Sequence, residues 1–515
     1  MVDTPTPVRR TPLLGLLFAV PAVLMLCSGY VVPTVRLLWT SLHRTVFFRE
    51  GGDFVGLDNY GRLDTMFGGG TFLAIGLGLA TGAVAVVGGG GLAYFANRAG
   101  RVGRRFVWIG FALPVAALSA VAIASAWQLA ISRREVNAFP DVEPGYAVVV
   151  LLATFGLLVG VGAAAYLLVF RSARKRGLAA GLAALVLVGA TLAVTLQSLA
   201  APLLIATRRE DAPPVLGIYN SAFRLGNLGV SAAGSVVLLL VLALLGVAVT
   251  AAVVFAQARL VRVEQPEPAG NPGFLAITLV VGGGALLVGI VGLLPWLLDL
   301  ADFGRLPDGP FEPWLLSWGP TLISTVVGVG AAVLAGFGIG ALRPLGRNSH
   351  LLLLPFAPWL FTGLGVTMVD AFQHLWRHDS DNFLFAFLRA IPPSSLNIPA
   401  LVLSAVLFRG LTTQDSPARS WRTAAPVVGL VALVTWVVQA NDVIWSLISV
   451  TDPGNGTMPY LAVSRGFAYS FGAESLVSWL YPIPGYLLTA AAIAVVGVFV
   501  LDRLALHTGP EDQPQ

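Results

Sequence analysis

The sequence is poor in charged residues. Only 11% of its 515 residues are Asp, Glu, Lys or Arg, whereas 56% are hydrophobic and the mean hydropathy is +0.82. A soluble domain carries about a quarter of its residues as charges. The composition therefore excludes an ordinary soluble fold and indicates a chain that lies in a lipid bilayer.

Cysteine and lysine are almost missing as well. Cys27 is the only cysteine, which excludes an intramolecular disulfide and a cysteine-ligated metal cluster. Lys175 is the only lysine and lies in RSARKRG, so the phosphate-binding motif GxxxxGK[ST] cannot occur. The chain therefore carries no ATPase of that kind, and we expect no cofactor in it.

Other signals of catalysis and of nucleic-acid binding are also lacking. The sequence has no nucleophile elbow and no paired carboxylates within an apolar run. Its arginines lie in small groups between apolar runs, without the interleaved aromatic residues of a nucleic-acid groove. We predict neither an enzyme nor a nucleic-acid-binding protein.

Apolar runs fill most of the chain. A helix needs roughly 20 apolar residues to cross about 30 Å of hydrocarbon. The runs predict an all-α polytopic membrane protein of about 12 transmembrane helices, of which 396–409 is the shortest. The predicted spans are 12–35, 71–96, 106–131, 146–170, 178–205, 231–257, 273–298, 318–342, 350–374, 396–409, 423–449 and 484–504.

A linker divides these spans into two units. The segment 259–272, RLVRVEQPEPAGNP, cannot form a span, and it separates a first unit (1–258) from a second (273–515). Pro114 lies in the third run and Pro358, 244 positions later, lies in the corresponding run of the second unit. Since each unit has about six spans, both would face the same way, as parallel repeats with a pathway between them.

The basic residues predict the orientation. Cytoplasmic loops are rich in Lys and Arg. The pattern places the N- and C-termini in the cytoplasm, and Arg171, Arg174, Lys175, Arg176, Arg409, Arg419 and Arg422 in two inner turns that could contact a cytoplasmic partner.

Four stretches resemble the permease subunits of binding-protein-dependent ABC importers of the maltose and general sugar type. FVGLDNYGRL (54–63) and YNSAFRLGNLGVSAA (219–233) are similar to segments of the first permease subunit. The run 318–342 with the loop RPLGRNSH, and QANDVIWSLISVTDPGNGTMPYLAV (439–463), are similar to segments of the second. The chain thus resembles both permease subunits fused head to tail.

This resemblance implies a function and partners. The chain would be the integral membrane permease of a carbohydrate or small-solute importer in the bacterial plasma (inner) membrane. A separate ATPase, which would bind the ATP, and an extracytoplasmic solute-binding protein would be its partners. However, the Glu-Ala-Ala segments that dock such permeases to the ATPase are absent, because the corresponding turns are only RSARKRG and RGLTTQDSPARSWR.

Polar residues inside apolar runs are the candidate pathway residues. A carboxylate or amide within the membrane needs water or a partner, so it marks either a pathway or an interhelical hydrogen bond. Aromatic rings could stack on a sugar or form an interfacial belt. The candidates are Gln197, Gln439, Asn441, Asp442, Trp127 and Trp445.

Three further interpretations remain open. A permease-derived protein that no longer couples to an ATPase would act as a scaffold, a sensor or an ATP-independent carrier. An unrelated secondary carrier would need a buried ionisable pair, for which Asp442 is the only candidate. The polar segment from Asp370 to Asp381 contains His374 and His378, four residues apart, which could hold a metal but are more typical of a solvated face.

Overall fold

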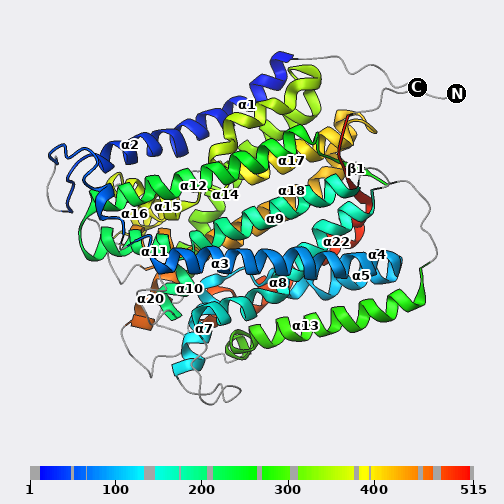
Figure 1. Ribbon diagram of the computed structural model, residues 1–515, viewed down its shortest axis with the longest axis horizontal. Helices are drawn as coiled ribbons and strands as arrows, with labels where there is room; N and C mark the ends of the chain where they lie inside the picture. The colour runs from blue at the N-terminus through cyan, green and yellow to red at the C-terminus, as the bar shows by residue number, and fades with distance from the viewer. Residues whose placement is uncertain are drawn as a thin grey trace.

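The computed structural model is helical and elongated (Figure 1). Its helices run roughly along one axis, as expected of spans that cross a bilayer together. We call the end with the strands β1 (Arg259–Arg262) and β2 (Leu504–His507) the sheet end, and the opposite end, with segment 52–64, the loop end. The structure describes residues 12–47, 52–64, 66–132, 145–172, 176–205, 213–263, 270–301, 311–375, 382–393, 396–450, 456–467 and 477–510.

Nine helices in the described part of the chain are long and apolar enough to span a membrane. Large apolar side chains cover their outer faces: on α13, for example, Val280, Leu287 and Leu298 are each more than 60% exposed. Such surface fits lipid better than water. The nine are α1 with α2 (Pro12–Leu26, Val32–Ser41), α3 with α4 (Gly69–Ala83, Gly90–Arg98), α8 (Tyr146–Phe170), α9 (Arg176–Leu196), α12 (Leu228–Phe255), α13 (Pro272–Ala301), α14 (Phe311–Phe337), α18 (Pro417–Ala440) and α22 (Ile483–Phe499).

Two further apolar segments are pairs of helices with a sharp bend between them. The first comprises α5 (Arg101–Gly110), α6 (Ala112–Ala116) and α7 (Ala120–Ser132) and bends by 72°. The second comprises the 3₁₀ helix Gly346–Trp359 and α15 (Leu364–Gln373) and bends by 68°.

Proline accounts for the position of both bends. Pro114 and Pro358 lie just before them, and a proline removes a backbone donor and clashes with the preceding turn. If each bent pair is one span, the described residues hold up to eleven. The multi-pass prediction is confirmed at that level, and the predicted run 396–409 is the shorter helix α17 (Ile398–Leu411).

Two predicted spans are interrupted, at corresponding positions in the two halves. We expected 178–205 and 423–449 to be single helices, but α9 ends at Leu196 and α18 ends at Ala440. Short helices follow each break: α10 (Ala200–Ile205) and α11 (Pro214–Tyr219) in the first half, and α19 (Val443–Ser449) and α20 (Met458–Phe467) in the second. The remaining short helices are α16 (Phe383–Arg389) and α21 (Val477–Leu480).

The first helix of each half packs against the other half. In the first half (residues up to 258), α1 lies on α14, and a Cβ on Gly15 would come within 3.2 Å of the carbonyl oxygen of Gly338. In the second half (residues from 273), α13 lies on α8, where Gly289 faces Gly156 so closely that a Cβ on Gly289 would meet its Cα at 2.8 Å. Small residues allow such close helix crossings.

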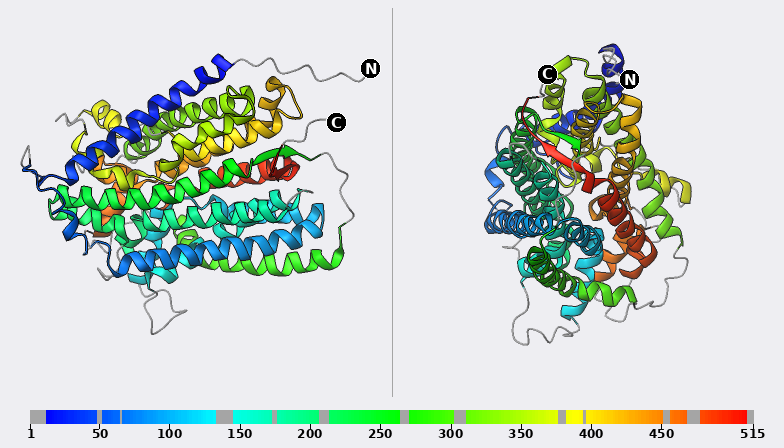
Figure 2. Two further views of the ribbon diagram at one scale, coloured as in Figure 1. Left: turned by 45° about the horizontal axis from the view of Figure 1, so that its top comes forward. Right: turned by 90° about the vertical axis from the view of Figure 1, so that its right-hand side faces the viewer.

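The described residues confirm the predicted all-α class, to which they add one short two-stranded sheet. Strand β1 pairs with β2 in antiparallel fashion, with Arg259 opposite His507, and the end-on view in Figure 2 shows the two strands side by side. The residues of β1 belong to the predicted linker 259–272, of which residues 264–269 lie outside the described part. The backbone of Leu260 contacts Gly410 near the end of α17, so the start of this segment is packed against the bundle.

Candidate functional site

Gln197 joins the two halves at the break after α9. Its Nε2 donates hydrogen bonds to the carbonyl oxygens of Phe361, at 2.8 Å, and of Ala193, at 3.0 Å. Its Oε1 accepts from the N–H of Gly363 at 2.8 Å. Phe361 and Gly363 lie at the bend of the second half, so this amide supplies partners to backbone groups that the bend withdraws from helical bonding.

Asn441 makes the corresponding contact from the second half to the first. Its Oδ1 accepts from the hydroxyl of Ser119 at 2.8 Å, and its Nδ2 donates to the carbonyl oxygen of Val437 at 2.8 Å. Ser119 lies at the bend of the first half and also accepts from the N–H of Ala122 at 3.2 Å, so it caps α7. We call the Gln197–Gly363 and Ser119–Asn441 contacts the two clasps.

The clasps have the same design. In each, the side-chain amide follows the end of a long helix or lies in its last turn, and it donates to the backbone carbonyl four residues earlier. The same amide also accepts a hydrogen bond from the other half, from the residue that directly precedes α15 (Gly363) or α7 (Ser119). Gln197 and Asn441 are 244 positions apart, as are Ser119 and Gly363. The clasps differ in burial, because Ser119 and Asn441 are 0% and 5% exposed whereas Gly363 is exposed and Gln197 is half-buried.

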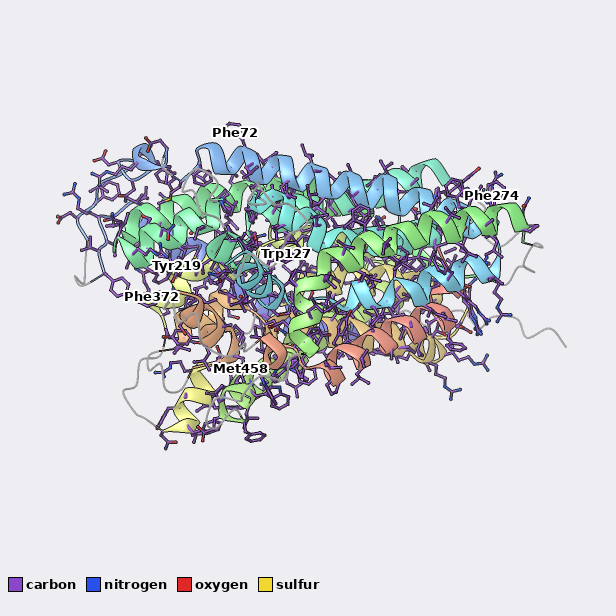
Figure 3. The ribbon with its side chains drawn as sticks, turned by 90° about the horizontal axis from the view of Figure 1, so that it is seen from below. Phe72, Trp127, Tyr219, Phe274, Phe372 and Met458 are labelled. Carbon is purple, nitrogen blue, oxygen red and sulfur yellow. The ribbon has the colours of Figure 1, made fainter. Side chains whose placement is uncertain are left out.

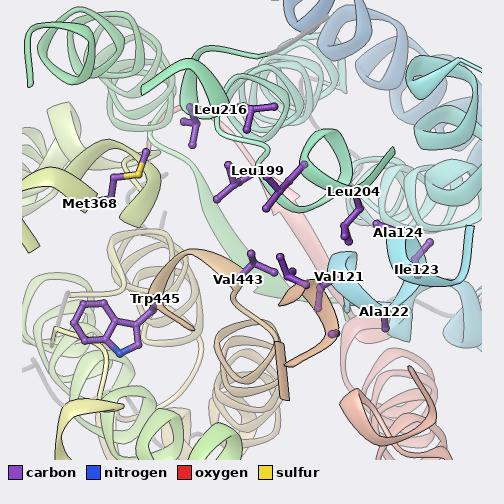
Figure 4. Packing of buried hydrophobic residues seen from close by; sticks show 14 of the residues in the cluster. Val121, Ala122, Ile123, Ala124, Leu199, Leu204, Leu216, Met368, Val443 and Trp445 are labelled. Atoms are coloured by element: carbon purple, nitrogen blue, oxygen red, sulfur yellow. The ribbon is translucent and has the colours of Figure 1, made fainter. Parts of the chain in front are cut away.

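Apolar side chains close the space around the clasps. Figure 4 shows buried residues from both halves packed together, including Leu199 and Leu216 from the first half and Met368 and Val443 from the second. Each of these four is less than 9% exposed. We call this group the apolar seal; in the state that the structure describes, it fills the interface between the halves at the level of the breaks.

Gln439 and Asp442 have partners within the second half. The Oε1 of Gln439 accepts from the hydroxyl of Thr325 on α14 at 3.0 Å. The carboxylate of Asp442 accepts from the N–H of Ile444 at 2.8 Å and caps α19. Asp442 thus has a local structural contact, which is an ordinary reason for an Asp at this position.

The two candidate tryptophans are buried and hydrogen-bonded. The Nε1 of Trp127 donates to the carbonyl oxygen of Gly292 at 3.0 Å, and Figure 3 places Trp127 in the interior beside α13. The Nε1 of Trp445 donates to the carbonyl oxygen of Ala390 at 2.9 Å. Both rings are less than 8% exposed, so they pack within the protein in this state.

A further contact between the halves lies toward the loop end and is made by aromatic rings. The ring of Phe372, at the end of α15, lies 4.9 Å from that of Phe47 and 5.1 Å from that of Phe223, between ring centroids. Phe223 in turn lies 5.2 Å from Tyr219. Figure 3 shows Tyr219 and Phe372 close together near this end. The YNSAF stretch of the first half therefore packs on a span of the second.

The two turns that we predicted to face the cytoplasm are short and lie toward the sheet end (Figure 1). Helix α8 ends at Phe170 and α9 begins at Arg176, so only residues 171–175 connect them. Helix α17 ends at Leu411 and α18 begins at Pro417. Neither turn leaves room for an intervening helix. The side-chain amide of Gln414, in the second turn, bonds the backbone N–H and carbonyl of Arg262 at 2.8 and 2.9 Å, so β1 covers this turn.

The basic residues of these turns have different environments. Arg176 donates from Nε to the carbonyl oxygen of Ser172 at 2.7 Å. Arg409 is 8% exposed, whereas Arg419 and Arg422 are exposed in the first turns of α18. Arg171 is half-buried after α8, and Arg174 and Lys175 lie outside the described residues.

The segment from Asp370 to Asp381 is only partly described. His374 Nδ1 lies 3.2 Å from a carboxylate oxygen of Asp370, one turn away on α15. Residues 376–381, including His378, fall outside the described part. Among the residues that are described, no group of three or more His, Cys, Asp or Glu side chains could hold a metal ion.

Sequence reasoning did not find three of the residues that join the halves. It missed Ser119 and Gly363 because a lone Ser or Gly in an apolar run carries no signal by itself. It also missed Asp502, whose carboxylate accepts from the Nε of Arg104 at 2.8 Å and links α5 to the chain after α22, with both side chains buried. The 244-residue offset could have indicated the first two.

Neither a comparison with models of known protein families nor comparisons with characterised proteins and with solved structures give a match for this chain.

Proposed function

We propose that the protein is the membrane-spanning permease of a small-solute importer, with a pathway between two parallel six-span repeats. The observation that carries this proposal is the pair of clasps. Pro114 and Pro358, Ser119 and Gly363, and Gln197 and Asn441 recur at the same offset of 244 residues. A pseudo-twofold axis along the membrane normal accounts for contacts that are made in both directions.

The proposed pathway opens where the clasps and the apolar seal now close it. The contacts at this level run between halves, whereas those of Gln439 and Asp442 run within one half. Rocking of two bodies would part the clasps if α1 moves with the second half and α13 with the first, because this keeps the packing of α1 on α14 and of α13 on α8. The solute class is a carbohydrate or another small polar molecule, and this rests on the resemblance of 54–63 and 439–463 to sugar permeases.

The proposed setting is the bacterial plasma membrane, with the sheet end in the cytoplasm. Helix α1 begins and β2 ends at the sheet end, which agrees with termini on one side. Arg419 and Arg422 are exposed there and are available to a cytoplasmic partner such as an ATPase. The loop end would then face an extracytoplasmic solute-binding protein.

A cross-link across one clasp tests the pathway. In a Cys27→Ser background the chain has no cysteine, so Ser119→Cys with Asn441→Cys can be joined by a short thiol cross-linker. Uptake of a panel of labelled sugars would be compared in host cells with and without the gene, and then before and after cross-linking. We expect reversible loss of uptake on cross-linking.

The matched control joins two residues within one half. Asn397→Cys with Thr435→Cys replaces a hydrogen bond of 3.0 Å that does not cross the interface, so its cross-link should leave uptake unchanged. Equal inhibition by both cross-links, or no gene-dependent uptake of any solute, would contradict the proposal.

A second candidate function is a permease-derived protein that does not couple to an ATPase. The short inner turns and the cover of β1 over the second turn favour it. Purification with each ATPase subunit of the same genome separates the candidates. A stable complex that Arg419→Gln with Arg422→Gln weakens, and that Arg101→Gln does not, supports the importer; absence of any complex supports the second candidate.

A further inference from the structure

The two strands at the sheet end pair residues that are equivalent in the two halves. The register of β1 and β2 places Val261 directly opposite Ala505. These residues are 244 positions apart, which is the offset that also relates the two clasps to each other. A pseudo-twofold axis with this offset exchanges Val261 with Ala505, so it passes between the strands at this pair. The end-on view in Figure 2 shows the strands lying across the end of the bundle.

Strand β1 follows the last helix of the first half but is held by the second half. It packs on α17, where the backbone of Leu260 contacts Gly410. The side-chain amide of Gln414 bonds both the N–H and the carbonyl oxygen of Arg262, at 2.8 and 2.9 Å. As long as these contacts are kept, β1 moves with the second half.

Strand β2 has the opposite arrangement. It follows α22 of the second half and packs on α8 of the first. Just before β2, the buried carboxylate of Asp502 accepts from the Nε of Arg104 on α5 at 2.8 Å. Helix α22 itself packs on α5 and α6. Strand β2 is therefore anchored to the first half.

Backbone hydrogen bonds join the two anchored strands. Beyond the four paired positions of the ladder, the N–H of Val263 donates to the carbonyl oxygen of Arg503 at 2.8 Å. The N–H of Gly509, after β2, donates to the carbonyl oxygen of Ala256, before β1, also at 2.8 Å. These bonds link a strand that is held by one half to a strand that is held by the other.

One face of the sheet is apolar and belongs to the core. Leu260 and Leu506 are opposite each other in the register, so their side chains project from the same face. Leu260 belongs to a buried apolar cluster built mainly from the second half, and Leu506 packs against this cluster and against one built from the first half. The sheet thus fills the sheet end with apolar side chains, as the apolar seal does at the level of the breaks.

We propose that β1 and β2 form a gate that closes the sheet end of the pathway, in series with the clasps and the apolar seal. This inference rests on the proposed pathway between the halves. Rocking that keeps each strand on its anchor pulls β1 away from β2, so this end opens only when the bonds between the strands break. An isolated two-stranded pair is at best marginally stable in water, which allows it to part and form again. At the sheet end, water can then pair with the freed N–H and C=O groups.

A disulfide across the strands tests the gate in transport. In the Cys27→Ser background, Val261→Cys with Ala505→Cys places two thiols opposite each other, where paired strand residues have Cα atoms about 4.5–5.5 Å apart and a disulfide can form. Cysteine is small and apolar, so these two buried positions should accept it. We expect oxidation to stop gene-dependent uptake of the labelled sugars and a reductant to restore it. The matched control, Arg98→Cys with Asn271→Cys, joins α4 to the residue before α13, at a backbone hydrogen bond of 3.2 Å, and should leave uptake unchanged.

Hydrogen exchange of the strand amides tests the gate without a transported solute. Mass spectrometry follows the deuterium uptake of peptides that contain β1 and β2 in the purified full chain. Cross-linking Ser119→Cys with Asn441→Cys holds the halves together, and we expect it to slow exchange in both strands about tenfold, within the usual range for coupled sites. The cross-link of Asn397→Cys with Thr435→Cys joins residues of one half and should change this exchange by about twofold or less.

The two measurements separate the gate from the proposed function. Uptake that the clasp cross-link stops and the strand disulfide leaves unchanged would overturn the gate, whereas the proposed pathway would stand. If no gene-dependent uptake is found, the proposed pathway fails, but exchange that slows only with the clasp cross-link would still support strands that part as the halves separate. Exchange that the clasp cross-link leaves unchanged, or that both cross-links slow equally, would overturn the gate.

Discussion

The buried clasp between Ser119 and Asn441 gives the sharpest quantitative prediction. Asn441→Ala removes the acceptor of the Ser119 hydroxyl and the donor to the carbonyl of Val437, both at 2.8 Å and both buried. Buried polar groups left without a partner cost about 1–3 kcal/mol. Ser119→Ala removes the same interface bond and the cap of α7, which is worth about 1 kcal/mol.

A double-mutant cycle isolates the contact between the halves. Hydrogen bonds between membrane helices average about 0.6 kcal/mol, with a maximum near 1.7 kcal/mol. We therefore expect the double variant to be less destabilised than the sum of the single variants by about 0.6–1.7 kcal/mol. Unfolding by dodecyl sulfate, followed by the fluorescence of the 12 tryptophans, measures each variant.

The control cycle combines Ser119→Ala with a substitution at Gln439, two residues before Asn441, in place of the substitution at Asn441 itself. Gln439 bonds Thr325 within the second half, so Ser119→Ala and Gln439→Ala should be additive within about 0.5 kcal/mol. If the cycle of Ser119 with Asn441 is additive to the same degree, the clasp does not join the halves and the reasoning about the pathway fails with it.

Three further changes probe other contacts between the halves. Gln197→Ala should lower the free energy of unfolding by about 1 kcal/mol or less. This is a smaller loss than for Asn441→Ala, because the contact of Gln197 with Gly363 is exposed, and the same unfolding assay measures it. Asp502→Asn should lower the free energy of unfolding by about 3–5 kcal/mol, because Arg104 loses a buried carboxylate partner. Asp502→Glu keeps the carboxylate and should lower the free energy of unfolding less than Asp502→Asn does. Gly292→Leu should prevent α13 from packing on α8, since its Cβ would overlap the carbonyl of Leu152, and size-exclusion chromatography should show loss of the folded species; Gly283→Leu on the same helix, where a Cβ meets nothing within 4 Å, should not.

The membrane class and most helix positions could be predicted from the sequence. The apolar runs are long, and in lipid only helices or closed barrels satisfy the backbone, so hydropathy alone locates spans well. The breaks at 197–199 and 441–442 could not be placed in this way, because the apolar character continues through them. Proline alone did not locate the two bends. An interior proline removes a helical hydrogen bond, and the bends follow Pro114 and Pro358, but Pro21, Pro295, Pro320 and Pro426 lie inside helices that continue.

The strands and the clasp partners needed tertiary information. The sequence RLVR at 259–262 is too short to predict a strand, and it forms one only because residues 504–507 lie beside it. Gln197 and Asn441 were recognisable as polar residues in apolar runs. Their partners Phe361, Gly363 and Ser119 were not, because a backbone group or a single hydroxyl leaves no pattern in the sequence.

The clasps also constrain how the two halves can separate. The N–H of Gly363 and the hydroxyl of Ser119 have partners that belong to the opposite half. In a membrane these groups need a partner at all times. Parting the halves therefore requires that water or the hydroxyl groups of a solute take the place of Gln197 and Asn441. For the proposed rocking we therefore expect the half-exposed Gln197 clasp to part before the buried Asn441 clasp, whereas a scaffold that never opens would need neither event.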